Sequence, residues 1–393
     1  MNQPDTTHPL LSIGFRPFFL LAGFGALMPV LSWVLVMAGV PAHEPYYGPE
    51  IFHAHEMLFG YVVAVMAGFL LTAIRNWTGV PTLSGRLLAA LAGVWIAGRL
   101  VALAGGVLPH LLIALVDLAF LPLLAWATWH PLAVAGNKRN MIFPGMLLAL
   151  ALANALVHAA QLGMLPAAVA EQVLTAGVLV ALVMIAVMAG RVFPMFTARG
   201  VPGMDKHVRP VAWAERAAVP VLLLFIPVLL WGSQTVLLPA VALAAAVIHG
   251  ARLFGWHHWL VWRVPLVWVL HAGYAWLVIG LALYALAWAL ELPHHIPLHA
   301  LSLGALGTIT LGMMSRVALG HSGRPLVAPP SMAVAFALVQ VAALLRVFGV
   351  LLWPEGYSLL VQVSGVLWTL AFVVFLAVYL PILSRPRIDG VPG

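Results

Sequence analysis

The sequence contains no cysteine and very few charged residues. Without cysteine there are no disulfides, iron–sulfur clusters or covalently attached c-type haem, so any metal must be bound by histidine, methionine, carboxylate or backbone oxygen. Only 7% of the 393 residues are charged, whereas 64% are hydrophobic. Soluble domains carry about 25% charged residues. Because a soluble protein of this size could not bury so much apolar surface, we expect the lipid bilayer to be its solvent.

The apolar residues form unbroken runs of about 20 residues, the length of a helix that crosses a hydrocarbon core about 30 Å thick. Strands of a membrane barrel alternate apolar and polar residues instead, so these runs favour helices. The sequence predicts an all-α, polytopic integral membrane protein with twelve transmembrane helices. The predicted spans are residues 18–39, 52–74, 86–104, 109–129, 141–162, 169–190, 214–232, 234–254, 264–290, 296–319, 330–352 and 358–383.

The basic residues predict the orientation of these helices. All but two of the eighteen lysines and arginines fall at one side of the predicted spans; the exceptions are Arg99 and Arg346. Since cytoplasmic loops are enriched in basic residues, both termini are expected inside, in a bacterial cytoplasmic (inner) membrane. The positive charges punctuate hydrophobic runs and form no basic domain, so the net charge of +7 does not indicate a nucleic-acid partner.

Arginines also recur at a regular interval. Arg16, Arg139 and Arg263 precede the first, fifth and ninth spans at spacings of 123 and 124 residues (139 − 16; 263 − 139). We predict three four-helix repeats within a single transmembrane domain. The alternative is that arginine and proline gather at any cytoplasmic helix end. The proposed repeats are residues 14–135, 136–260 and 261–385.

Histidine is abundant, with sixteen residues against eleven acids. Ionisable residues inside a bilayer are costly and usually functional. His53, His55 and Glu56 open the second span at its outer end, and His299 opens the tenth. His158 lies about 25 Å from the inner start of the fifth span, at 1.5 Å per helical residue. Because imidazole suits iron, copper and zinc, these five residues are the candidate metal ligands.

The spacing of the histidine pair leaves more than one arrangement open. On a regular helix His53 and His55 point about 200° apart, so they serve either two metals or one metal with an outer supporting group. Glu56 shares a face with His53 and is expected to accept its second N–H. The alternative is hydrogen bonding between helices by interfacial histidines. Small residues in the tenth span, such as Gly304 and Gly307, would admit either a helix or a flat macrocycle.

Five segments resemble the NnrS family. They are GFRPFF at 14–19, HAHEMLFG at 53–60, RNWTG at 75–79, GRVFPMFT at 190–197, and the stretch from His299 through Arg316 to GHSGR at 320–324. The resemblance runs from residue 14 to about 330. It implies a membrane protein with haem b and copper that acts in the nitric oxide response, accompanies denitrification and protects against nitrosative stress. Nitric oxide or a related small molecule, and a quinol donor, are the expected partners.

The proposed repeat is also similar to haem–copper oxidases, whose second and tenth helices carry axial haem histidines near the outer face. By this analogy His53 or His55 would share a haem with His299. The sixth predicted span has no histidine, so a complete binuclear centre is not expected. Arg75 and Arg316 are expected either to anchor helices at the cytoplasmic surface or to pair with haem propionates or anionic lipid.

A secondary transporter is the main alternative function. Twelve helices suit a transporter, but transporters usually show two related halves, whereas the arginine spacing suggests thirds. A structural or assembly factor is a third interpretation, although it gives the histidines no role. Whether the protein is an enzyme stays open at this point.

Overall fold

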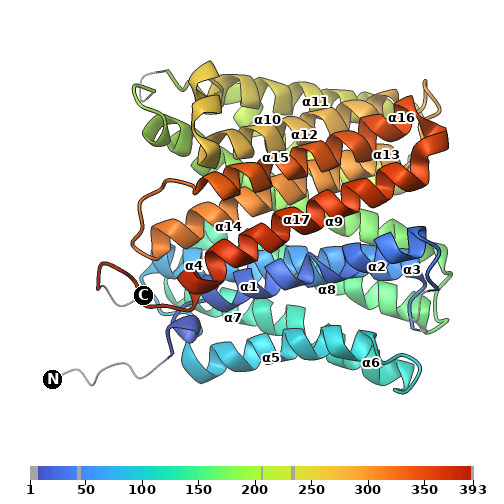
Figure 1. The fold of residues 1–393 in the computed structure, drawn as a ribbon, viewed down its shortest axis with the longest axis horizontal. Helices are drawn as coiled ribbons and strands as arrows, with labels where there is room; N and C mark the ends of the chain where they lie inside the picture. The colour runs from blue at the N-terminus through green and yellow to red at the C-terminus, as the bar shows by residue number, and fades with distance from the viewer. Residues whose placement is uncertain (1–7, 42–45, 205–206, 232–234, 391–393) are drawn as a thin grey trace. The chain divides into compact units, whose positions relative to one another are not determined.

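The computed structural model describes residues 8–41, 46–204, 207–231 and 235–390, and within them every regular element is a helix (Figure 1). Twelve of the helical stretches are long and apolar enough to cross a membrane, which confirms the predicted all-α membrane fold. The first six are built from α1 (Phe15–Gly25) and α2 (Met28–Met37); α3 (Pro49–His55), η2 (Glu56–Val62) and α4 (Val63–Thr78); α5 (Gly85–Ala102); α6 (His110–Leu118) and α7 (Phe120–Val134); η3 (Lys138–Asn140) and α8 (Ile142–Gln161); and α9 (Ala168–Gly200).

The other six follow in the second half of the chain. They are α10 (Ala212–Trp231); α11 (Leu237–Trp256); α12 (Pro265–Ala287); α13 (His295–His299), η5 (Ala300–Gly307) and α14 (Thr308–His321); α15 (Pro330–Leu344), η6 (Leu345–Gly349) and α16 (Val350–Leu352); and η7 (Pro354–Gly356) with α17 (Tyr357–Leu383). The predicted orientation and the three repeats stay predictions.

Local chemistry explains several of the helix ends. Pro49, Pro265 and Pro330 stand at the first position of their helices, where the missing N–H is not needed. α4 ends at Gly79, whose φ of 70° is the left-handed conformation that glycine adopts without strain. α9 runs ten residues past its predicted end at 190, to Gly200, although Pro194 lies inside this extension.

Three segments are wound as π-helix: η2, η5 and η6. This winding is rare and is frequently found at functional sites. η2 begins directly after His55, η5 begins directly after His299, and η6 contains Arg346. η2 and η5 therefore each follow a histidine that the sequence identified as a candidate ligand. η6 contains one of the two arginines on the side predicted to be outer.

The described chain divides into two compact units. Unit 1 holds the residues up to 174 together with 314–326 and those from 372 onward, and unit 2 holds 175–313 and 327–371. Within unit 1, α1 packs against α4 and η2, α5 against α6, and α7 against α8 and α4 (Figure 1). These contacts bring the outer ends of the predicted second to fifth spans into one unit.

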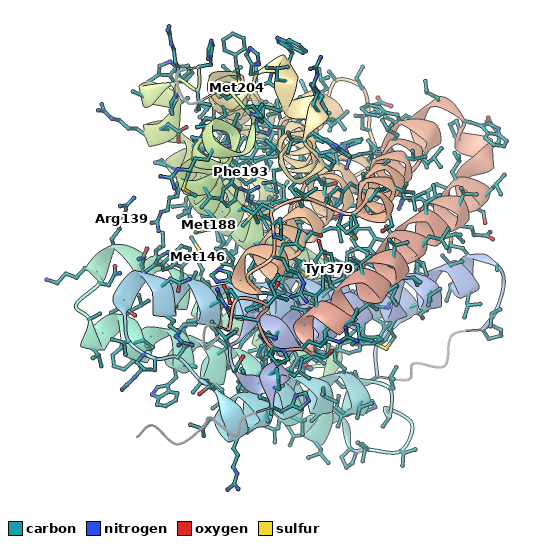
Figure 2. The ribbon with its side chains drawn as sticks, turned by 60° about the vertical axis from the view of Figure 1, so that its left-hand side comes forward. Arg139, Met146, Met188, Phe193, Met204 and Tyr379 are labelled. Atoms are coloured by element: carbon teal, nitrogen blue, oxygen red, sulfur yellow. The ribbon has the colours of Figure 1, made fainter. Side chains whose placement is uncertain are left out.

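Unit 2 is organised around α12, which packs against α11 and η5. Phe193 projects from α9 (Figure 2), and its ring lies 5.9 Å from the rings of both Trp256 and Tyr274. A Cβ added at Gly304 would lie 2.7 Å from the Trp276 ring. Gly304 therefore makes room for α12. Of the two occupants expected for the small residues of the tenth span, a helix or a flat macrocycle, the structure places a helix at Gly304.

Candidate metal centre in unit 1

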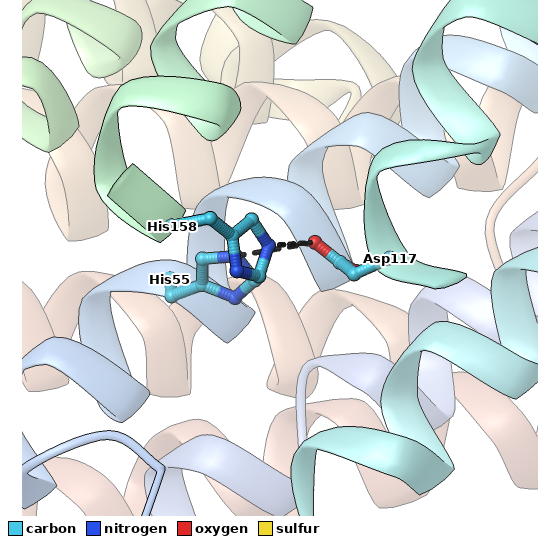
Figure 3. A group of neighbouring side chains, drawn as sticks. All are labelled: His55, Asp117 and His158. Atoms are coloured by element: carbon cyan, nitrogen blue, oxygen red, sulfur yellow. Dashed lines mark hydrogen bonds and ion pairs between the residues drawn. The ribbon is translucent and has the colours of Figure 1, made fainter. Parts of the chain in front are cut away.

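Three buried side chains from three helices of unit 1 form a candidate metal centre (Figure 3). His55 ends α3, Asp117 lies in α6 and His158 in α8, and one ligand atom of each lies within 4.8 Å of the others. His158 Nε2 is 3.0 Å, and His55 Nε2 3.4 Å, from the same oxygen, Asp117 Oδ2. Two imidazoles and a carboxylate are a ligand set that iron, copper and zinc accept.

The helix α3 presents His55 to this centre because of where its apolar residues fall. Phe52 and His55 are buried, and a spacing of three residues places their side chains on one face of α3. α3 starts with Gly48 in an extended conformation and Glu50 in the first turn, where a negative charge suits the helix dipole. His53 faces away from this stripe and is only half-buried.

Both histidines of the centre are held from their far side. Glu56 Oε1 lies 3.0 Å from His55 Nδ1, and the Tyr46 hydroxyl lies 2.6 Å from His158 Nδ1. In metal sites a ligating histidine usually engages its second nitrogen with an oxygen, which sets the ring orientation and the tautomer. The two rings are therefore oriented with their Nε2 atoms toward Asp117.

Arg99 of α5 neutralises part of the negative charge of the centre. Its guanidinium pairs with Asp117 Oδ1 through Nη2 and with Glu56 Oε2 through Nε at 2.8 Å, and Nη1 donates to the Phe59 carbonyl at 3.0 Å. Two carboxylates against one guanidinium leave one negative charge. Because an uncompensated buried charge is costly, the centre requires a further positive charge, from a proton or a metal ion.

Asn154 of α8 connects His55 to Asp117. Its Nδ2 donates to Asp117 Oδ2 at 2.7 Å, and since a carboxylate only accepts, this contact orients the amide. Asn154 Oδ1 then lies 2.9 Å from His55 Nε2. Both ring nitrogens of His55 therefore face acceptors, because Nδ1 faces Glu56. A second ring proton or a cation at Nε2 satisfies this arrangement.

Two glycines make room for the ion pairs. A Cβ at Gly98 of α5 would lie 2.8 Å from Asp117 Oδ1, and a Cβ at Gly60 of η2 would lie 3.0 Å from Glu56 Oε2. Any side chain at either position would displace a carboxylate from Arg99. The close approach of α5 to α6 and η2 therefore depends on these glycines.

Tyr46 and Tyr47 precede α3 and pack against the centre from outside the spans. Both are nearly fully buried, their rings are 4.6 Å apart, and the Tyr47 hydroxyl lies 3.1 Å from His55 Nε2. Burial, followed by the negative charge of Asp117, raises the pKa of both phenols. Both hydroxyls therefore stay protonated at physiological pH, and Tyr46 can donate to His158.

The structure brings together three of the predicted metal residues: His55, His158 and Glu56. Glu56 was expected to accept from His53, whereas its Oε1 contacts His55 Nδ1. That expectation assumed regular α-helix, but the winding changes to π-helix at Glu56. His53 Nδ1 instead donates to the Pro29 carbonyl at 3.1 Å, and its ring lies 5.6 Å from that of Trp33.

The other predicted residues lie elsewhere. His299 belongs to unit 2, where its Nδ1 donates to the His295 carbonyl at 2.7 Å. Arg75 is exposed in the last turn of α4, and Arg316 is buried in α14. The expected haem between His299 and His53 or His55, and the pairing of these arginines with propionates, stay predictions.

Sequence reasoning missed Asp117, Asn154 and Tyr46, and it set Arg99 aside. Asp117 carried a signal, because it is the only acidic residue in the predicted span 109–129. Arg99 carried another, as one of two basic residues on the side predicted to be outer. An arginine and an aspartate inside neighbouring spans are natural partners, since each alone would be costly in the bilayer.

A second buried polar network lies in unit 2 and offers no comparable ligand set. His249 Nε2 donates to the Ala218 carbonyl at 3.2 Å, and its Nδ1 lies 2.7 Å from the Tyr274 hydroxyl. Arg252 pairs with Glu215 at 2.8 Å and donates to Tyr274. One imidazole with both nitrogens engaged does not make a metal centre, so the group reads as a closed ion-pair network.

Comparison with known proteins agrees with the motifs. None of the curated proteins matches the sequence. A model of the NnrS protein family matches residues 9–387, which include the terminal helices beyond residue 330 as well as the whole His55–Asp117–His158 centre. Because this match covers nearly the whole chain, the protein belongs to the NnrS family.

Proposed function

We propose that this protein acts in the response to nitric oxide through a redox-active metal ion held by His55, Asp117 and His158. Membership of the NnrS family supports the role in the nitric oxide response. One observation supports the metal above all: two buried imidazoles direct Nε2 toward one carboxylate oxygen while an oxygen holds each Nδ1. The proposed location is the bacterial inner membrane.

The donor set fits copper or iron. Atoms bound to one ion at about 2 Å lie roughly 3 Å apart, close to the 3.0 and 3.4 Å that separate the imidazole nitrogens from Asp117 Oδ2. Copper(II), iron(II) and zinc accept imidazole and carboxylate, whereas copper(I) prefers sulfur ligands, of which this centre has none among the described residues. When bound, copper or iron supplies electron exchange with nitric oxide or a related molecule, with a quinol as the proposed donor.

The residues around the centre have separate tasks in this proposal. Glu56 and Tyr46 orient the two imidazoles, and Arg99 holds Asp117 Oδ1 so that Oδ2 faces the histidines. His55 carries the exchangeable charge, because both its nitrogens face acceptors. Since metal ligands must be deprotonated, loading of the centre at neutral pH is expected to release a proton from His55.

A haem does not fit between His55 and His158. A bis-histidine haem separates the two ligand nitrogens by about 4 Å with the macrocycle between them, by the roughly 2 Å bond of imidazole to metal. Here both Nε2 atoms face one oxygen, Asp117 Oδ2, the two rings are inclined at 75° with centroids 5.6 Å apart, and Asn154 bonds to both His55 and Asp117. The haem b that the family suggests therefore needs another histidine, and His299 is the candidate that we propose.

Metal analysis of the purified full-length protein tests the centre. His55→Ala and His158→Ala are expected to remove the copper or iron, because each takes away one of three ligands. His53→Ala is the matched control, since it removes a neighbouring histidine of the same helix that contacts Pro29 and Trp33 and is not one of the three ligands. Full metal content in both site variants would refute the metal centre.

Cells then test the function separately. A deletion strain that carries His158→Ala is expected to grow normally until it is challenged with nitric oxide and then to fail like the deletion. The strain with His53→Ala is expected to survive. Protection by a stably inserted, metal-free His158→Ala protein would separate the nitric oxide role from this metal.

A proton-coupled secondary transporter is the second candidate. A continuous chain of contacts runs from Tyr46 through His158, Asp117 and His55 to Glu56. Such carboxylate–histidine chains inside a membrane are typical of proton relays. Proton movement coupled to a solute in vesicles, with no metal in the protein, would favour this function over the metal centre.

A further inference from the structure

Arg346 is a buried arginine of unit 2 whose charge has no carboxylate partner in the described part of the chain. It lies in η6 and is only 5% exposed. Its Nη1 is buried without a hydrogen-bond partner, and its Nη2 is 3.4 Å from the Tyr357 hydroxyl. None of the ion pairs among the described residues includes Arg346.

This charge cannot be removed by loss of a proton, because a guanidinium stays protonated in proteins. Its one ring contact is weak compensation: the guanidinium lies over the Tyr357 ring at 5.4 Å from the centroid. A cation–π contact lowers the cost of burial but leaves the net charge in place. The position therefore calls for an anion.

A second buried nitrogen lies in the same place. His295 Nε2 is buried without a hydrogen-bond partner, and the His295 ring lies 5.7 Å from the Tyr357 ring. α13, which begins at His295, packs against η6. Arg346 and His295 thus both contact Tyr357, and each has a buried nitrogen without a hydrogen-bond partner.

The local winding is unusual as well. Arg346 lies inside η6, and η5 begins directly after α13. A π-helical turn shifts the side chains that follow it relative to a regular helix and is frequently found at functional sites. Two such turns therefore border the position where both unpartnered nitrogens lie.

We propose that Arg346, His295 and Tyr357 bind one anionic oxygen group, a carboxylate or a small monovalent oxyanion such as nitrite. One guanidinium matches one negative charge, and its unpartnered Nη1, the phenol and the imidazole supply hydrogen-bond donors. The group is either a free oxyanion or a carboxylate carried by a bound porphyrin. This proposal rests on unit 2 alone and does not depend on the metal centre of unit 1.

Thermal unfolding of the full-length protein in neutral detergent tests the site, with sodium nitrite or sodium formate as the probe. A ligand that binds only the folded protein raises its melting temperature with concentration. The wild type and Arg346→Lys are expected to respond, whereas Arg346→Gln is not. Arg209→Gln, which removes an exposed arginine of unit 2, is the matched control and is expected to respond like the wild type.

Two milder variants keep the test decisive if Arg346→Gln fails to insert. Tyr357→Phe and His295→Gln retain the arginine and remove one donor each. Each is expected to raise the anion concentration for the half-maximal shift about tenfold, the usual effect of losing a hydrogen bond to a charged group. Unchanged half-maximal concentrations in both variants would place the anion elsewhere.

Porphyrin content distinguishes the two sources of the anionic group. If neither nitrite nor formate stabilises the wild type, but Arg346→Gln and Tyr357→Phe retain less porphyrin than Arg209→Gln, the group is a porphyrin carboxylate. The proposal is wrong if the variants match the wild type in both measurements. It is also wrong if Arg346→Gln melts at a higher temperature than the wild type at every anion concentration tested. Metal content at His55 is expected to stay unchanged in these variants, so failure here is separable from failure of the metal centre.

Discussion

Arg99 in unit 1 and Arg346 in unit 2 are both buried arginines, but they differ in their partners. Both are buried, and both lie toward the ends of their helices that the charge distribution predicts to be outer. Arg99 pairs with Glu56 and Asp117, whereas Arg346 has no ion pair among the described residues and lies 3.4 Å from the Tyr357 hydroxyl. Arg99 is therefore the counter-ion of two carboxylates, whereas Arg346 has no carboxylate partner among the described residues and is the residue for which we propose an anionic ligand.

In the predicted repeat, Arg99 and Arg346 occupy corresponding positions. Arg346 follows Arg99 by 247 residues (346 − 99), and Arg263 follows Arg16 by the same number (263 − 16). By the same offset, Ser364 is the residue that corresponds to Asp117 in the predicted repeat (117 + 247). Ser364 Oγ donates to the Ala342 carbonyl at 2.9 Å, so it offers no charge. If the predicted repeat holds, the residue that corresponds to Asp117 carries no charge, in agreement with the lack of an ion pair for Arg346 among the described residues.

Removing each arginine in turn has the largest expected effect. Arg99→Gln leaves two buried carboxylates without their counter-ion and is expected to lower the free energy of unfolding by about 3–5 kcal/mol. Arg346→Gln removes a charge with no protein counter-ion, so in anion-free buffer stability is expected to stay level or rise. Tryptophan fluorescence during thermal unfolding measures both. Equal losses in the free energy of unfolding would mean that both arginines stabilise the fold as counter-ions.

A double-mutant cycle sharpens the same contrast at intermediate magnitude. Asp117→Asn combined with Arg99→Gln is expected to destabilise the protein by about 2 kcal/mol less than the sum of the single changes, because the two side chains form one ion pair. Asp117→Asn combined with Arg346→Gln is expected to be additive within about 0.5 kcal/mol, since they share no partner among the described residues. An additive Arg99 cycle would show that the ion pair contributes nothing.

The helices were predictable because each is an apolar run of sufficient length, and the predicted ends mostly fall within a few residues of the observed ones. His55 and His158 were identified as candidates because depth follows from counting residues along a helix. Their shared partner Asp117 was not, since its contacts depend on how α3, α6 and α8 pack. The spacing of residues within one helix does not indicate how that helix packs against the others.

Two other departures from prediction have local causes. Glu56 was assigned to His53 on the assumption of regular α-helix, but the second span changes to π-helix at that residue. The sequence carries no simple signal for this winding. Tyr46 lies in a loop, where neither hydrophobic period nor charge marks a residue that will hold His158.

The smallest expected effect concerns the neutral hydrogen bonds that support each site. Tyr46→Phe removes the hydroxyl that holds His158 Nδ1, and loss of such an outer partner typically weakens metal binding about tenfold or more. Because the pKa of Tyr46 is raised, its hydroxyl is protonated throughout, and the deficit is expected to be constant between about pH 6 and 8. Metal titration of the purified variant at several pH values measures this.

Tyr274→Phe is the matched control, since Tyr274 is equally buried but holds His249 in the closed network of unit 2. It is expected to leave metal affinity unchanged, just as Tyr46→Phe is expected to leave the anion response of unit 2 unchanged. A deficit in Tyr46→Phe that grows as the pH rises would mean that the phenol ionises and acts as more than a positioning group. A loss of metal affinity in Tyr274→Phe would mean that the two units do not act independently, and the contrast between Arg99 and Arg346 would then lose its structural basis.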